Sequence, residues 1–99
     1  MLLIRRFEEK LDELFSSGVI KGTSHLYAGQ EAVAVGVCAA LENADLMTST
    51  HRGHGHFLAK GGDPNTLMAE LWGKATGNSK GRGGSQHVAD YSIGFLGSN

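Results

Sequence analysis

The sequence predicts a chain that is mostly α-helical, with one short strand and a glycine-rich loop at its C-terminal end. Apolar residues recur at helical spacing in residues 2–17 and again in residues 63–73. The run LMTST at 46–50 has the β-branched and hydroxyl composition of a strand. From residue 73 onward glycine is frequent and apolar residues are sparse, so we expect this part to build no core and to form either a flexible tail or a loop that lies over other residues.

The first helix is expected over residues 2–17, where apolar residues return every three or four positions. This stripe consists of Leu3, Ile4, Phe7, Leu11, Leu14 and Phe15. Ser16, Ser17 and Gly18 are typical of the end of a helix. The stripe indicates a helix that packs on a core, and the same face can serve as a partner interface.

A second helix is expected over residues 30–42. Its central run, AVAVGVCAAL, is apolar on every side, which predicts a helix that is buried all round. A chain of 99 residues has difficulty covering such a helix by itself. We therefore expect additional protein around it.

The remaining elements follow the strand at 46–50. A helical turn or short helix is expected at 54–60, and Asp63 followed by Pro64 predicts the start of a helix that runs to residue 73. Trp72 is expected in the core of that helix's apolar face. The chain then divides into a helical part (1–45), a strand with an anion-binding turn (46–62), a helix (63–73) and a glycine-rich loop (74–99).

Composition excludes several classes of protein. Nine Lys and Arg against ten Asp and Glu give a net charge of −1, which argues against a dedicated binder of nucleic acid or membrane surfaces. Residues 51–99 carry five bases, three acids and four histidines, so this half is mildly suited to an anion. Cys38 is the only cysteine, which excludes a disulfide within the chain and favours a reducing compartment. We see no signal peptide and no apolar run of membrane-spanning length, and we expect a cytoplasmic protein.

The stretch THRGHGH at 50–56 holds His51, His54 and His56 around Arg52. Three imidazoles can bind zinc, but neither helical nor extended spacing puts all three on one face, and no acidic or cysteine ligand lies nearby. Exposed structural histidines are a second interpretation. A third is an anion site, because Arg52 follows a strand, and open α/β sheets bind ligands at the carboxyl ends of their strands.

Two further stretches have weaker signals. The run KGRGGSQH at 80–87 is either a solvated loop or a backbone cradle for phosphate, and it does not match the P-loop or the dinucleotide fingerprint. In HLYAGQEA at 25–32, Glu31 suits the start of a helix, and His25 by itself is what a structural histidine looks like.

Taken in order, six motifs resemble one family from end to end. They are RRFEEK, GTSHLYAGQEAVAVG, STHRGHGHFLAKGG, MAELWGKATG, KGRGGSQHVAD and GFLGSN. The chain resembles the alpha subunit of thiamine-diphosphate-dependent E1 dehydrogenases, which act on acetoin, pyruvate or branched-chain 2-oxoacids. The resemblance implies an α/β, thiamine-diphosphate-binding fold for the parent protein. The sequence around the histidines is most similar to that of acetoin dehydrogenase alpha subunits, since pyruvate-type sequences usually have tyrosine where this chain has His51.

The resemblance also implies roles for individual residues. Arg52 would contact the cofactor diphosphate, with His51 lining the same site, and His25 would lie near the substrate. Ser85 and His87 would border the active-site channel, with His87 affecting proton traffic there. His54 would be structural or support the residues around it.

The family's magnesium-binding segments follow the position of Asn99, so the resemblance implies that the magnesium ligands are absent from this chain and that it is an N-terminal fragment. An E1 beta subunit, in an α2β2 assembly, and a lipoyl-bearing E2 are the implied partners. Alone, the chain is expected to be inactive, to bind cofactor weakly at best and to form a homo-oligomer. A non-enzymatic oligomerising chain and a histidine-metal protein remain as alternatives.

Overall fold

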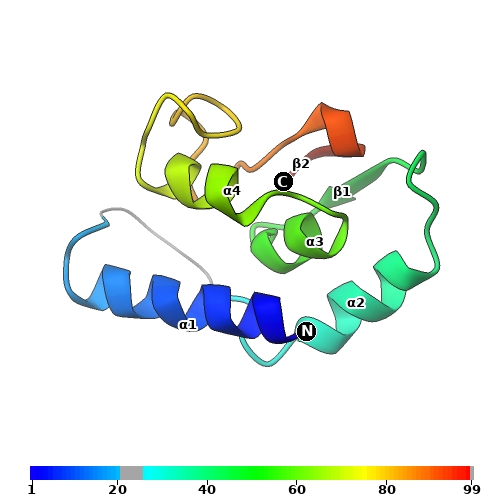
Figure 1. The fold of residues 1–99 in the computed structure, drawn as a ribbon, viewed down its shortest axis with the longest axis horizontal. Coiled ribbons are helices and arrows are strands. Elements are labelled where there is room, and N and C mark those ends of the chain that lie inside the picture. Colours follow the sequence, from blue (N-terminus) through cyan, green and yellow to red (C-terminus); the bar gives the residue numbers. More distant parts are fainter. Residues whose placement is uncertain (21–25, 99) are drawn as a thin grey trace.

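The described part of the chain, residues 1–20 and 26–98 of a computed structural model, forms four α-helices, one 3-10 helix and a small parallel sheet. The helices are α1 (Leu2–Ser16), α2 (Glu31–Ala39), α3 (His54–Ala59) and α4 (Pro64–Leu71), and the 3-10 helix is η1 (Tyr91–Ile93). The strands are β1 (Met47–Ser49) and β2 (Phe95–Ser98). Figure 1 shows α3 beside β1, with α4 to the left of α3 and α1 below both helices. The mostly helical prediction is confirmed, whereas the prediction of a single strand is wrong.

The second strand arises from the C-terminal segment, which was expected to form only a loop. β2 pairs in parallel with β1, and Met47 lies opposite Phe95. The turn that leads into β2 depends on Gly94, which has a φ of +79° and on which a Cβ would lie 2.5 Å from the carbonyl oxygen of Asp45. The segment also contributes Val88 and Phe95 to the core, both fully buried. Such pairing between distant residues leaves no local pattern, which is why the sequence did not predict it.

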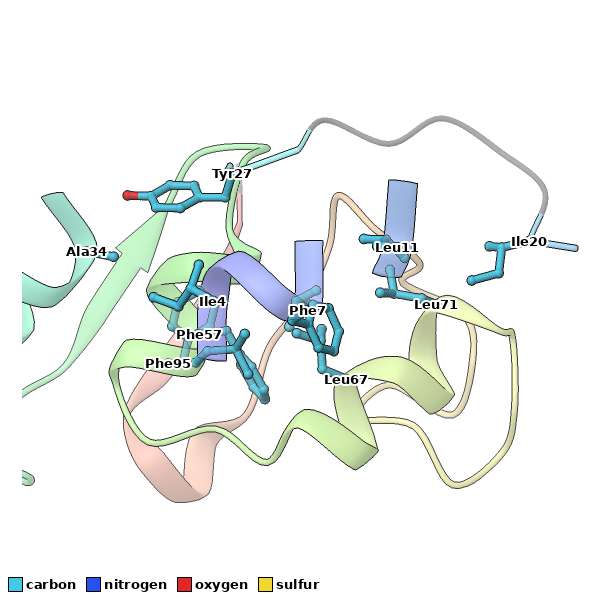
Figure 2. Packing of buried hydrophobic residues seen from close by; sticks show 12 residues of the cluster. Ile4, Phe7, Leu11, Ile20, Tyr27, Ala34, Phe57, Leu67, Leu71 and Phe95 are labelled. Carbon is cyan, nitrogen blue, oxygen red and sulfur yellow. The ribbon is translucent and has the colours of Figure 1, made fainter. Parts of the chain in front are cut away.

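The core lies where α1, α3, α4 and β2 meet. Figure 2 shows their apolar side chains pointing into the same space. From α1 the buried side chains are Ile4, Phe7 and Leu11, which are spaced by three and four residues as the helical period requires. Leu3, which the predicted stripe included, is 52% exposed. The true face is therefore rotated slightly, and it also buries Glu8.

α2 is shorter and more exposed than predicted. It ends at Ala39 instead of residue 42, because the carboxylate of Asp45 accepts a hydrogen bond of 2.7 Å from the backbone N–H of Glu42 and forms a turn there. Val33 and Val37 are 59% and 55% exposed, so the helix is not buried all round. It packs on α3, and its buried residues are Glu31 and Ala34, one helical turn apart. Neither α2 nor any other helix in the described segments is long and apolar enough to cross a membrane.

α4 begins where the sequence predicts. The side chain of Asp63 accepts a hydrogen bond of 2.8 Å from the backbone N–H of Asn65, and Pro64 occupies the first turn. The helix ends at Leu71, two residues before the predicted end. Trp72 therefore falls at the C-cap and is 41% exposed, so its predicted place in the core is wrong.

Candidate functional site

Arg52 lies in the short turn that connects β1 to α3, at the carboxyl end of the strand. Its side chain is half-buried, and Nη1 donates a hydrogen bond of 2.6 Å to the backbone carbonyl of Leu26. A guanidinium has five N–H donors, so this contact leaves others for an anion. The same hydrogen bond ties the turn to the segment that follows His25. His25 itself lies outside the described residues.

The three clustered histidines have different environments. His51 is exposed, His56 is half-buried, and His54 is fully buried. Among residues 1–20 and 26–98, no group of three or more His, Cys, Asp or Glu side chains is arranged to hold a metal ion.

His54 joins three segments that are far apart in the sequence. Its Nδ1 lies 2.8 Å from Oε1 of Glu8 in α1, and because a carboxylate only accepts, Nδ1 donates its hydrogen. Its Nε2 lies 3.0 Å from both the carbonyl oxygen and the hydroxyl of Ser85. All of this is shielded from water, since Glu8 and His54 are 0% exposed. The geometry agrees with the structural role that the resemblance implied for His54.

His56 belongs to a second set of contacts, beside Arg52. Its Nε2 lies 2.8 Å from the hydroxyl of Tyr27, and its Nδ1 contacts the hydroxyl of Ser49 at the end of β1. Burial lowers the pKa of the His56 imidazole, which favours the neutral ring at pH 7. A Cβ on Gly55 would lie 2.2 Å from the Tyr27 ring, so glycine is needed for this close approach. Tyr27 and the turn at 52–56 are thus held against each other beside the strand end.

The glycine-rich loop turns its backbone N–H groups inward, onto Glu70 of α4. Oε1 of Glu70 accepts hydrogen bonds from the N–H groups of Ser79 (2.5 Å) and Gly81 (3.0 Å). Oε2 accepts from Gly83 (2.8 Å) and Gly84 (3.1 Å). Burial alone would raise the pKa of this carboxyl, but the four hydrogen bonds together lower it. The suggestion that these amides cradle a phosphate is therefore wrong, because the protein's own carboxylate binds them.

Glu8 and Glu70 were not predicted as site residues, although the sequence carries a signal for both. Each carboxylate lies on the apolar face of its helix, Glu8 between Phe7 and Leu11 and Glu70 beside Leu71. An acidic residue within an apolar stripe has to find hydrogen-bond donors when the stripe is buried.

Ser85 and His87 lie at the end of the loop, next to these contacts. Ser85 is buried against His54, whereas the side chain of His87 is exposed. His54 connects the two predicted parts of the site, the turn that holds Arg52 and the segment that holds Ser85 and His87. It follows Arg52 by two residues and contacts Ser85, which precedes His87 by two residues.

Glu31, the acidic residue of the GQEA run, pairs with Arg5 of α1. Its hydrogen bond with Arg5 is the main cause that lowers the pKa of the Glu31 carboxyl, and the same bond raises the pKa of the Arg5 guanidinium. The side chain of Glu31 thus links the first two helices in addition to occupying the first turn of α2.

Comparison with known proteins identifies the family. The model of the dehydrogenase E1 component matches residues 1–99, the whole chain. The chain belongs to the dehydrogenase E1 component family. The match confirms the resemblance seen in the ordered motifs.

Individual E1 relatives cover the chain completely. It is 63% identical over 99 residues to the alpha subunit of acetoin:2,6-dichlorophenolindophenol oxidoreductase from Bacillus subtilis (strain 168), of which it covers 30%. The corresponding subunit from Cupriavidus necator is 52% identical over 99 residues, again with 30% of that protein covered. The alpha subunit of the pyruvate dehydrogenase E1 component from Zymomonas mobilis is 52% identical over 100 residues, 28% of its length. The chain thus spans less than a third of the length of these E1 relatives.

Proposed function

We propose that this E1 chain forms one side of a thiamine diphosphate site, in which Arg52 binds the diphosphate. The observation that carries the proposal is the position of Arg52 at the carboxyl end of β1, half-buried and oriented by the carbonyl of Leu26. The donor set suits such a group, since a permanently charged planar fork is matched to phosphate oxygens. Gly53, next in the chain, has no side chain to obstruct an approaching anion.

The other site residues have roles in the same proposal. His51 lines the diphosphate side, and His25 acts near the substrate. Ser85 and His87 border the channel, where His87 holds or moves a proton. His54 supports both sides from the interior. In this proposal, residues 1–99 are the N-terminal part of an α/β, thiamine-diphosphate-binding domain.

Thiamine diphosphate, when bound, supplies an electron sink that allows a carbon–carbon bond next to a carbonyl to break. We place the chain in the alpha subunit of an α2β2 E1 enzyme that acts on acetoin or a 2-oxoacid. A lipoyl-bearing E2 receives the acyl group, and we expect the enzyme to be cytoplasmic. We assign no magnesium ligand to this chain.

Arg52→Gln tests the proposal in the assembled E1 enzyme, with affinity for thiamine diphosphate measured by calorimetry in the presence of magnesium. The loss of a charge-assisted hydrogen bond, about 1.5–3 kcal/mol, corresponds to a dissociation constant roughly 10–100-fold higher. Arg6→Gln is the matched control, because Arg6 is an exposed arginine of α1. An unchanged affinity for Arg52→Gln would overturn the diphosphate role.

The same titration on residues 1–99 alone tests whether they form only one side of the site. We expect weak binding and no turnover. Tight, magnesium-dependent binding by the 99-residue chain would contradict the proposal of a partial site.

A non-enzymatic, oligomerising chain is the second candidate function, and the exposed valines of α2 favour it. Val33 and Val37 are both more than half exposed on one apolar helix. In this case light scattering should detect a defined homo-oligomer whose size is the same with and without thiamine diphosphate. An assembly that changes with cofactor supports the E1 role instead.

A further inference from the structure

The contact between Glu70 and the glycine-rich loop has a consequence for the site, because this loop leads directly to Ser85 and His87. A carboxylate offers about four lone-pair positions to hydrogen-bond donors. In Glu70 all four are used, two on each oxygen, by the amides of residues 79, 81, 83 and 84. Since Glu70 is 0% exposed, water does not compete for these contacts. The loop is therefore arranged around a fixed internal anion.

The backbone of the loop supports this interpretation independently. Lys80 has a φ of +56°, a left-handed conformation that costs a residue with a side chain about 1 kcal/mol or more. Gly81 and Gly84 also have positive φ values, of +82° and +65°. Such left-handed positions within a turn can direct several backbone N–H groups towards one centre. Here the centre is the Glu70 carboxylate, which stabilises a conformation that the chain would otherwise avoid.

Close packing gives the loop little freedom to move away from α4. A Cβ on Gly77 would lie 2.5 Å from Cα of Glu70, and a Cβ on Gly81 would lie 2.5 Å from the carbonyl of Gly73. On Gly83 a Cβ would lie 2.4 Å from the carbonyl oxygen of His87. These glycines are thus required for contact. Of the two alternatives that the composition left open, the loop that lies over other residues agrees with this packing.

We propose that Glu70 is a positioning residue for the active site: its carboxylate fixes residues 79–84 and thereby sets where Ser85 and His87 lie. The proposal rests on the function proposed above, in which these two residues border the channel. The hydrogen bonds of Glu70 are with the loop that leads to Ser85 and His87, whereas Arg52, the proposed diphosphate ligand, lies in the turn between β1 and α3. Substitution of Glu70 should therefore affect catalysis more than cofactor affinity.

The first test measures loop order on the chain itself and needs no cofactor. In Glu70→Ala we expect amide hydrogen exchange at residues 79, 81, 83 and 84 to become at least about tenfold faster, since each amide loses its acceptor. Formate or acetate, which replaces the missing carboxylate, should partly restore protection in this variant and have no effect on the unaltered chain. Glu42→Ala is the matched control, because Glu42 is exposed.

A second variant covers the case in which Glu70→Ala does not fold. Glu70→Gln keeps the size of the side chain but replaces one acceptor oxygen with an amide donor, so protection should fall at only one pair of amides, either 79 and 81 or 83 and 84. In the unaltered chain, NMR scalar couplings through the hydrogen bonds should connect the four amide nitrogens to the Glu70 carboxyl carbon. If the couplings are missing, or if exchange is unchanged in both variants, the proposal is wrong.

The third measurement separates this proposal from the function on which it rests. In the assembled E1 enzyme, Glu70→Gln should lower kcat for the acetoin or 2-oxoacid substrate about tenfold or more, while the dissociation constant of thiamine diphosphate changes less than about twofold. Glu70→Asp, which keeps the charge, should recover part of kcat. If exchange responds but kcat does not, the loop is structural only and the positioning role fails. If instead Arg52→Gln leaves cofactor affinity unchanged, the proposed function fails while the exchange result stands.

Discussion

Glu8→Ala is expected to destabilise the protein strongly, although Glu8 is an acidic residue on a helix. The substitution removes the acceptor that lies 2.8 Å from Nδ1 of His54, and both side chains are 0% exposed. A buried donor left without a partner costs about 1–3 kcal/mol. We expect a loss of about 2 kcal/mol, which lowers the midpoint of thermal unfolding by roughly 8–16 °C in a domain of this size.

Urea and thermal unfolding followed by circular dichroism measure this effect at neutral pH. Glu9→Ala is the matched control: Glu9 is the next residue of α1 but is exposed, so its replacement should change stability by less than about 0.5 kcal/mol. The loss of stability in Glu8→Gln should fall between those of the other two variants, because its amide oxygen still accepts from His54. Its amide nitrogen takes the place of Oε2, which is buried without a hydrogen-bond partner among the described residues. A double-mutant cycle with His54→Ala should give a coupling energy of about 1 kcal/mol or more. If Glu8→Ala is no more destabilising than Glu9→Ala, the reasoning about the buried pair is refuted.

Three other changes have clear expected outcomes. Gly55→Ala should destabilise the protein by about 1–3 kcal/mol, because the new Cβ would lie 2.2 Å from the Tyr27 ring. Gly36→Ala, in open space within α2, should instead stabilise it by about 0.5–1 kcal/mol. Chemical denaturation of both variants measures the two effects. Asp63→Ala removes the N-cap of α4 and should cost about 1 kcal/mol, seen as a midpoint lower by roughly 4–8 °C, and an unchanged midpoint would show that the cap does not contribute. The pKa of the Glu70 carboxyl is lower in the folded state, because four backbone N–H groups hydrogen-bond to it. Its contribution to stability is therefore complete above the ordinary pKa of a glutamate and is lost as the pH falls through the lower folded value. Urea unfolding over the acid range should show a steeper loss of stability for the unaltered chain than for Glu70→Gln.

Local signals account for the parts of the fold that sequence analysis predicted well. α1 follows from the apolar repeat that includes Phe7 and Leu11, and the start of α4 follows from Asp63 and Pro64. The position of Arg52 after a strand was also correct, since β1 ends three residues before it. Each of these features depends on residues within one or two helical turns of one another, where side-chain spacing and backbone capping decide the structure.

Contacts between distant residues account for what was missed. β2 forms because Phe95 packs against Phe57, with ring centroids 5.7 Å apart, and because the strand pairs with β1 almost fifty residues earlier. Trp72 was assigned to the core because it continues the apolar spacing of α4, but the helix ends one residue before it. Helix ends and long-range strand pairing depend on neighbours in space that a local pattern does not contain.

For the glycine-rich loop, the prediction that its backbone N–H groups bind an anion was chemically correct, but the predicted anion was wrong. A glycine-rich loop with several positive φ values does present N–H groups to an anion, as the composition suggested. The anion is Glu70, thirteen residues before Gly83, and not a ligand. Its only mark in the sequence is a carboxylate on the buried face of a helix, and Glu8 has the same mark in α1. Both carboxylates hold the same loop, Glu70 directly and Glu8 through His54 and Ser85. An acidic residue within an apolar stripe is therefore better read as the anchor of a distant backbone segment than as an interruption of the stripe.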